Sequence, residues 1–262
     1  MVKKFIERFY VGFILFFLYA PIIILIILSF NNSKSRSKWG GFTLHWYKEL
    51  FKNESIMNAL YTTLIIALAS AFIATLIGTA AAIAINSMKK TPRTIMVAIT
   101  NIPMLNADIV TGISLMLLFV AMRYTLGFTS VLISHITFNI PYVILSVMPK
   151  LKQLNPHTFE AALDLGASPV YAFFKVILPD IFPGVLTGFF LAFTMSLDDF
   201  VITHFTKGPE INTLSTKIYT EVRKGIKPEI YALSTLMFIA VLLLLIIVNR
   251  RNAERKEPIR KM

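Results

Sequence analysis

The sequence predicts an all-α membrane protein with six transmembrane helices, and three observations indicate this fold class. Of the 262 residues, 56% are hydrophobic and 15% are charged, whereas soluble domains contain about 25% charged residues. The apolar residues form six runs, each long enough to cross about 30 Å of hydrocarbon. The net charge of +12 comes from Lys and Arg between these runs, so it does not indicate one basic face for nucleic acid.

The predicted spans cover residues 9–30, 59–85, 95–122, 124–148, 181–205 and 230–249. The first follows a basic start that resembles a signal peptide, but its run of about 22 residues has no small-residue cleavage site. We therefore expect a retained first helix. The second lies in a stretch without charge. Asp108 interrupts the third, and His135 is the titratable imidazole of the fourth. The fifth contains Asp198 and Asp199. Short alternating segments typical of a β-barrel are not present in the sequence.

The distribution of Lys and Arg predicts the orientation. Six crossings place both termini on one side, and that side holds 15 of the 26 Lys and Arg residues. Short loops close to the membrane carry most of the positive-inside signal. We therefore expect both termini, and the loop of residues 149–180, on the cytoplasmic side of a bacterial inner membrane.

The loop of residues 149–180 predicts two short helices. Asn155 and Pro156 suit an N-cap and a first helical position, and Gly166 suits the left-handed position that ends a helix. Ser168 and Pro169 repeat the start signal, and Pro179 should disturb the entry into the fifth span. The first short helix could rest on lipid headgroups. It has two acids and is poor in Lys and Arg, which favours a docking element for a cytoplasmic protein.

This loop resembles the EAA loop of ABC importer permeases. Glu160-Ala161-Ala162, three residues, Gly166, nine residues and then Val176-Ile177-Leu178-Pro179 follow the family pattern, except that Val176 replaces an Ile. We call residues 149–180 the EAA loop. Further segments resemble permeases of spermidine and putrescine importers: 134–138, 164–168, 196–199, and 208–209 followed by 217–219.

The resemblance covers essentially the whole chain and implies one permease domain, residues 1–262, with the type I importer fold of the methionine permease. It implies half of a polyamine pathway, with a second permease subunit, two copies of a cytoplasmic ATPase and an external substrate-binding protein as partners, and lipid around the spans. The residues implied to couple to the ATPase are Glu160, Ala161, Ala162, Asp164, Gly166, Leu178 and Pro179.

Nucleotide chemistry is expected on another chain. The sequence contains no G-x-x-x-x-G-K-[ST] phosphate loop. We therefore expect no enzyme activity, no catalytic residue and no cofactor in this chain, with Mg-ATP bound by the partner ATPase. His135 suits a hydrogen-bonded histidine of the helix bundle better than a metal ligand, because no second His lies at ligand spacing. We expect no metal site and no nucleic-acid partner.

Acids inside spans are costly and indicate function. Asp108 lies about 21 Å, and Asp198 about 26 Å, along their spans from the cytoplasmic side. Carboxylates there would meet a cation that arrives from outside. We expect a substrate pathway formed by Asp108, Asp198, Asp199, Thr111, Phe138 and Tyr142, in which aromatic faces add cation–π contacts. Adjacent Asp198 and Asp199 cannot both face one lumen equally, and Asp108 could instead pair with a backbone group freed by Pro103 or with a neighbouring helix.

Three other readings stay open at this point. The solute could be another small molecule, since an external receptor would make most of the selection. A secondary transporter could use the three Asp residues as a proton relay, although the two halves show no inverted repeat. A membrane scaffold would leave these Asp residues unexplained.

A seam of small residues on the second span (Ser70, Ala74, Gly78 and Ala82) predicts close helix packing.

Overall fold

The computed structural model describes residues 2–33, 35, 37–155, 157–225 and 227–254. Within these residues the regular structure is helical, apart from one antiparallel bridge between Asn31 and Phe42. The chain divides into two compact units, Met1–Met57 with Ile218–Met262, and Asn58–Lys217. Each unit is described by itself.

The first unit is built around α1 (Val2–Ser29), α2 (His45–Lys52) and α12 (Pro228–Glu254), with α12 packed on both α1 and α2. Trp46 fixes the corner between α1 and α2. Its buried indole N–H donates to the carbonyl of Asn31 over 2.7 Å. The Asn53 amide also donates to Glu229 over 3.2 Å, which ties the end of α2 to the first turn of α12.

The second unit contains a bundle of long helices. Most of α3 (Glu54–Ser87) belongs to it, and α6 (Phe128–Gln153) packs along α9 (Leu178–Asp198). Buried apolar residues of these three helices form one core. Further helices of this unit are α4 (Lys90–Leu105), α5 (Asp108–Ala121), α10 (Val201–Thr206) and the start of α11 (Leu214–Lys224), besides those of the EAA loop.

The seam of small residues on α3 packs closely, as predicted. Ser70, Ala74 and Ala82 are fully buried. A Cβ atom on Gly78 would lie 2.7 Å from the Cβ atom of Val143 on α6. The absence of a side chain at Gly78 therefore sets how closely α3 and α6 approach.

The third predicted span, residues 95–122, is not one continuous helix. The segment forms two helices, α4 and α5, bent by 100°. Asn106 and Ala107 are extended at the break, and Pro103 inside α4 removes a backbone donor one turn earlier. Asp108 therefore begins a helix, in the first turn where a negative charge is favoured by the helix dipole.

Other boundaries also differ from the prediction. The fourth predicted span begins at Phe128 and continues to Gln153. The fifth ends at Asp198, because Asp199 is extended with ψ 125°, and the chain then forms the separate helix α10. Among the described residues, four helices are long and apolar enough to cross a membrane, or five if the bent pair counts as one. The apolar part of α12 that the structure describes is shorter, Pro228–Leu243.

The EAA loop has the predicted helices and caps, α7 (His157–Asp164) and α8 (Pro169–Ala172). The Asn155 side chain accepts from the His157 amide, and the Ser168 hydroxyl accepts from the Tyr171 amide. Gly166 ends α7 with φ +86°. Pro156, predicted at the first helical position, lies outside the described residues.

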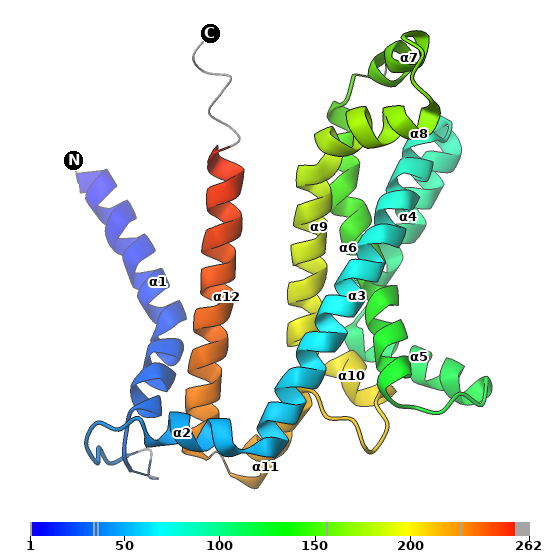
Figure 1. Cartoon of the computed structure of the whole chain (residues 1–262). Coiled ribbons are helices and arrows are strands. Elements are labelled where there is room, and N and C mark those ends of the chain that lie inside the picture. The colour runs from blue at the N-terminus through cyan, green and yellow to red at the C-terminus, as the bar shows by residue number, and fades with distance from the viewer. Residues whose placement is uncertain (1, 34, 36, 156, 226, 255–262) are drawn as a thin grey trace. The chain divides into compact units, whose positions relative to one another are not determined.

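Pro179 does not end the helix that precedes it. A π-helical segment, η1 (Phe173–Ile177), joins α8 to α9 and places Pro179 in the first turn of α9. The extra residue in the π turn accommodates the missing proline N–H. In Figure 1, α7 and α8 lie at one end of the second unit, and α5 and α10 lie at the other.

Candidate functional site

The predicted pathway residues meet around one cavity at the α5 and α10 end of the second unit. Its volume is about 230 Å³. The residues that line this acidic cavity are Asp108, Phe138, Tyr142, Met195, Asp198, Asp199, Phe200, Val201 and Ile202. Five of the six predicted pathway residues are therefore brought together from α5, α6 and the end of α9. The sixth, Thr111, is half-buried one turn further along α5 and is not among the lining residues.

Asp108 and Asp198 present their side chains differently from Asp199. Both are exposed within the isolated chain, whereas the side chain of Asp199 is 8% exposed. The Oδ1 atom of Asp199 accepts from the Ile202 amide, and its Oδ2 atom accepts from the Thr203 amide over 2.7 Å. The carboxylate of Asp199 therefore caps the first turn of α10 from the position just before its N-cap residue, Phe200. Asp108 and Asp198 are the two carboxylates with room for a ligand.

Two aromatic residues of the lining, Phe138 and Tyr142, come from α6. Phe138 and Tyr142 are four residues apart and hence share a helix face. Both are half-buried, and Phe138 also packs edge-on against His135 with ring centroids 5.2 Å apart. The cavity thus combines two exposed carboxylates with aromatic surface, which are the groups that bind an organic cation.

A buried polar network behind the cavity was not predicted. His135 is 1% exposed, and it was expected to be hydrogen-bonded within the bundle, which the structure confirms. Its partners, Ser196 and Thr203, lie 61 and 68 residues away in sequence. The hydroxyl residues Ser196 and Thr203 on the fifth predicted span were the available signal, but local spacing does not reveal such distant pairings.

The residues of the EAA motif that were predicted to couple to a partner are mostly accessible in the isolated chain. Glu160, Ala161 and Asp164 are exposed on α7, and Ala162 is half-buried. Glu160 lies 3.2 Å from His157 Nδ1 on the surface. Leu178 differs, because it packs against the core at the start of α9, while Pro179 is exposed.

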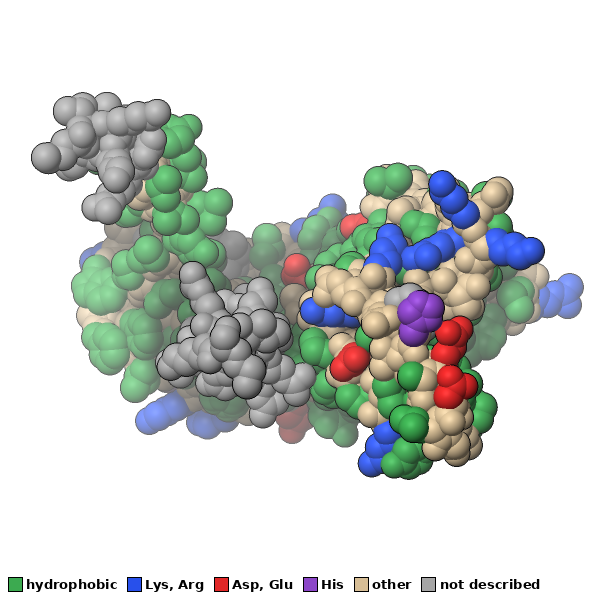
Figure 2. Space-filling model, turned by 90° about the horizontal axis from the view of Figure 1, so that it is seen from above, with side chains coloured by type: hydrophobic (Ala, Val, Ile, Leu, Met, Phe, Trp, Pro, Cys, Tyr) green, Lys and Arg blue, Asp and Glu red, His purple; other side chains and the backbone are tan. Residues whose placement is uncertain are grey.

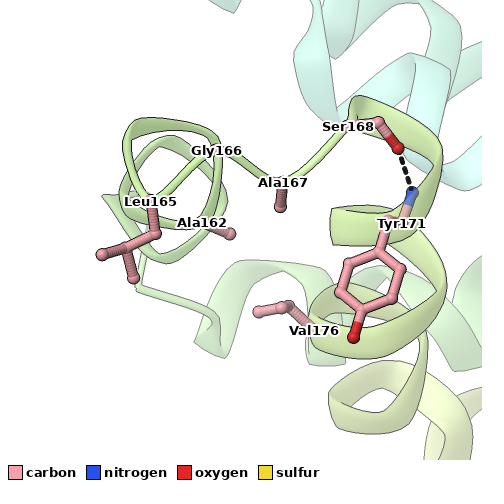
Figure 3. A pocket seen from close by; sticks show the side chains of 7 residues that line it. All are labelled: Ala162, Leu165, Gly166, Ala167, Ser168, Tyr171 and Val176. Carbon is pink, nitrogen blue, oxygen red and sulfur yellow. Dashed lines mark hydrogen bonds between the residues drawn. The ribbon is translucent and has the colours of Figure 1, made fainter.

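A hollow of about 560 Å³ lies between α7 and the helix that follows it (Figure 3). The side chains of Ala167 and Val176 point towards this space, and Leu165 points outward from α7. Leu165 is 89% exposed, and Tyr171 and Phe174 are more than half exposed. In Figure 2, which looks onto this end of the second unit, charged side chains of both signs gather around apolar ones. The EAA loop therefore presents an apolar surface with a charged border.

In the part of the chain that the structure describes, His, Asp and Glu side chains form no group of three or more that could hold a metal ion. The acids of the cavity line it together with the aromatic rings of α6.

Comparisons with known proteins agree with the motif and the fold. Residues 74–256 match the family described as binding-protein-dependent transport system inner membrane component. The chain is 41% identical over 230 residues to the spermidine/putrescine transport system permease protein PotC of Escherichia coli strain K12, covering 88% of this chain and 87% of that protein. It is 39% identical over 232 residues to the putrescine transport system permease protein PotI of the same strain, covering 86% and 83%.

Solved structures show the same fold at low sequence identity. A bacterial ABC transporter involved in the import of the polysaccharide alginate matches with a TM-score of 0.77 and 13% identity, over 95% of this chain and 96% of that one. The MetNI methionine ABC transporter matches with a TM-score of 0.63 and 16% identity, over 82% and 99%. The chain therefore belongs to the family of binding-protein-dependent transport system inner membrane components.

Proposed function

We propose that this chain forms half of the translocation pathway of an ATP-driven importer for polyamines such as spermidine and putrescine. The observation that carries the proposal is the acidic cavity, where Asp108 and Asp198 face a common space. The names of relatives PotC and PotI, which span most of this chain, support the same substrate class.

The chemistry of a polyamine fits this cavity. Each ammonium group carries hydrogen-bond donors that need acceptors once water is removed, and Asp108 and Asp198 supply carboxylate oxygens. The methylene segments between ammonium groups suit the faces of Phe138 and Tyr142, which also attract cations. A volume of about 230 Å³ suits part of an extended chain, so the substrate would pass through in steps with its ammonium groups bound in turn.

The EAA loop would dock on a separate ATPase. Its exposed side chains include the apolar Leu165, Tyr171 and Phe174 and the acidic Glu160 and Asp164. Burial of this surface in a partner removes apolar area from water, which is the main driving force for association. Because the sequence has no phosphate loop, Mg-ATP would bind to the partner, and its closure would move the loop.

The full assembly would contain a second permease subunit, two ATPase copies and an external substrate-binding protein, surrounded by lipid. We propose six crossings with both termini in the cytoplasm: the four long helices, the bent pair α4 and α5, and α12. Exposed large apolar side chains on α1, α3 and α5 suit contact with lipid tails or with the second permease subunit.

The test uses the reconstituted complex with all of its subunits. Asp108→Asn, Asp198→Asn and the double variant should each lower uptake of radiolabelled spermidine, and the double variant should lose most of it, because the amide removes the negative charge with little change of shape. Glu54→Gln, an exposed acid outside the cavity, is the matched control and should transport normally. Unchanged uptake in both single variants and the double variant would refute the role of the cavity.

A second measurement tests the coupling role separately. A bulky residue at Gly166 should release the ATPase while the two permease subunits stay together, as measured by affinity purification of the permease pair. A secondary transporter would keep uptake without the ATPase, driven by an ion gradient. Retention of the ATPase in the Gly166 variant would refute docking through the EAA loop.

A further inference from the structure

His135 lies at the centre of a buried hydrogen-bond network in the second unit. Its Nδ1 atom is 2.5 Å from the hydroxyl of Ser196, which is itself 3.0 Å from the hydroxyl of Ser70 on α3. Its Nε2 atom is 2.9 Å from the hydroxyl of Thr203 and 3.4 Å from Oδ2 of Asp199. One imidazole therefore connects α3, α6, α9 and α10.

The hydroxyl of Thr203 fixes the direction of one link. It donates its single hydrogen to Oδ2 of Asp199 over 2.7 Å, so it accepts from His135. The Nε2 atom of His135 therefore carries a hydrogen, which points towards Thr203 and Asp199. Oδ2 of Asp199 receives the hydroxyl and the amide of Thr203, and Oδ1 receives the amide of Ile202.

These bonds hold the break between α9 and α10 in one geometry. Asp199 is extended, and its backbone carbonyl accepts from the Ser215 hydroxyl over 2.6 Å. Asp198 is the last residue of α9. While the carboxylate of Asp199 caps α10, the backbone cannot turn so that Asp198 takes its place in the wall. As a result, Asp198 is exposed at the acidic cavity and Asp199 is held in its wall.

We propose that His135 is a positioning residue for the cation site: through Thr203 it holds Asp199 as the cap of α10, so that Asp198 is the carboxylate presented to the substrate together with Asp108. This inference rests on the proposed function for its consequence in transport. The geometric part, that His135 sets the accessibility of residue 198, stands on the network alone.

The physical reason is the low polarity of the surroundings. His135, Ser196 and Thr203 are each 2% exposed or less, so a lost partner cannot be replaced by bulk water. Without the Nε2 donor, the Thr203 hydroxyl loses the bond that orients it towards Asp199. The carboxylate of Asp199 is then free to turn into the cavity, and the backbone at Asp198 loses its fixed direction.

The experiment measures the accessibility of position 198 directly. The chain has no Cys, so Asp198→Cys introduces a single thiol into it. In the assembled importer, we would follow by mass spectrometry the rate at which a cationic methanethiosulfonate reagent modifies this thiol. His135→Gln and Thr203→Val should each change the rate on the order of tenfold, the size expected for a buried hydrogen bond.

Two matched controls separate positioning from general loosening. Thr203→Ser keeps the hydroxyl and should restore the parental rate, whereas Thr203→Val keeps the shape and loses the hydroxyl. A thiol introduced by Asp108→Cys lies on α5 at the same cavity, and its rate should stay the same in all backgrounds. If the rate at position 198 is equal in the His135→Gln, Thr203→Val and Thr203→Ser backgrounds, or if both thiols change together, the inference is overturned.

Transport kinetics then separate this inference from the proposed function. With Asp198 intact, His135→Gln should raise the KM for spermidine uptake on the order of tenfold, while the ATPase stays bound. Normal uptake by Asp108→Asn and Asp198→Asn would refute the cation site but leave the labelling result valid. An unchanged KM in His135→Gln, with Asp198→Asn impaired, would refute the positioning role alone. If His135→Gln does not assemble, the Thr203 pair carries both measurements.

Discussion

Replacement of Gly78 by Ala should loosen the contact between α3 and α6. The added Cβ atom would lie 2.7 Å from Cβ and 2.8 Å from Cγ1 of Val143, and 3.2 Å from the carbonyl oxygen of Ile140. Ordinary van der Waals contact begins at 3.4–4 Å, so the two helices must separate by about 1 Å. Overpacking of this kind costs about 1–3 kcal/mol of the free energy of unfolding.

Val143 has no room to move away from α3. It is fully buried, and on its other side a Cβ atom at Gly188 of α9 would already lie 3.2 Å from its Cα atom. The closest contact involves the Cβ atom of Val143, which Ala also carries. We therefore expect that Val143→Ala will not rescue Gly78→Ala, because the 2.7 Å contact remains.

The assay is thermal unfolding of the purified importer in detergent, with a fluorescent tag fused to this chain as the signal. A cost of about 1–3 kcal/mol corresponds to a melting temperature lower by roughly 3–10 °C. Gly12→Ala is the matched control, a helical glycine with nothing within 4 Å of the added atom, and it should not lower the melting temperature. Equal melting temperatures for the two variants would refute the packing argument.

Three further outcomes are expected. Gly208→Ala should cost about 3 kcal/mol, because its Cβ would collide with the backbone carbonyl of Leu126, which cannot move aside; a normal melting temperature would contradict this. Gly166→Ala adds no collision but places a side chain at φ +86°, a strain of about 1–2 kcal/mol; binding of the ATPase should weaken while the melting temperature of the permease pair stays within a few degrees, and full binding would contradict it. Trp46→Phe keeps an aromatic ring but leaves the Asn31 carbonyl without its 2.7 Å donor, which should cost about 1–3 kcal/mol in thermal unfolding; Trp39→Phe, the same substitution at an exposed position, is the control and should cost less.

Local chemistry in the sequence predicted the ends of the short helices well. Asn155, Gly166 and Ser168 act through atoms within a few residues, so their identity and spacing sufficed. The seam on α3 was predictable for a similar reason, since residues four apart share one face. The accessible face of the EAA motif likewise followed from its position in a loop between apolar runs.

The bend at Asn106 and the cap at Asp199 depend on the rest of the fold. Hydropathy counts apolar residues and is insensitive to a 100° change of direction between two helices. His135 and Thr203 determine which of Asp198 and Asp199 is presented to the substrate. His135 is far from both acids in sequence, so rules based on neighbouring residues cannot predict the outcome. The meeting of Asp108 with Asp198 was expected from their depth, and Phe138 and Tyr142 were expected beside them as sources of cation–π contacts. The sequence did not show how α6 packs to bring these two rings to the wall.

The π-helical segment Phe173–Ile177 joins α8 to α9 and sets the rotation of α8 about the helix axis relative to α9. An α-helix turns about 100° per residue, and the segment contributes one residue more than an α-helical path would use. Deletion of one residue from this segment would keep every side chain of α7 and α9. It would rotate α7 by about 100° about the helix axis, relative to the face of α9 that carries Ser196 and Asp198. The orientation of α7 relative to the acidic cavity therefore depends on the number of residues in the π-helical segment as well as on their identity.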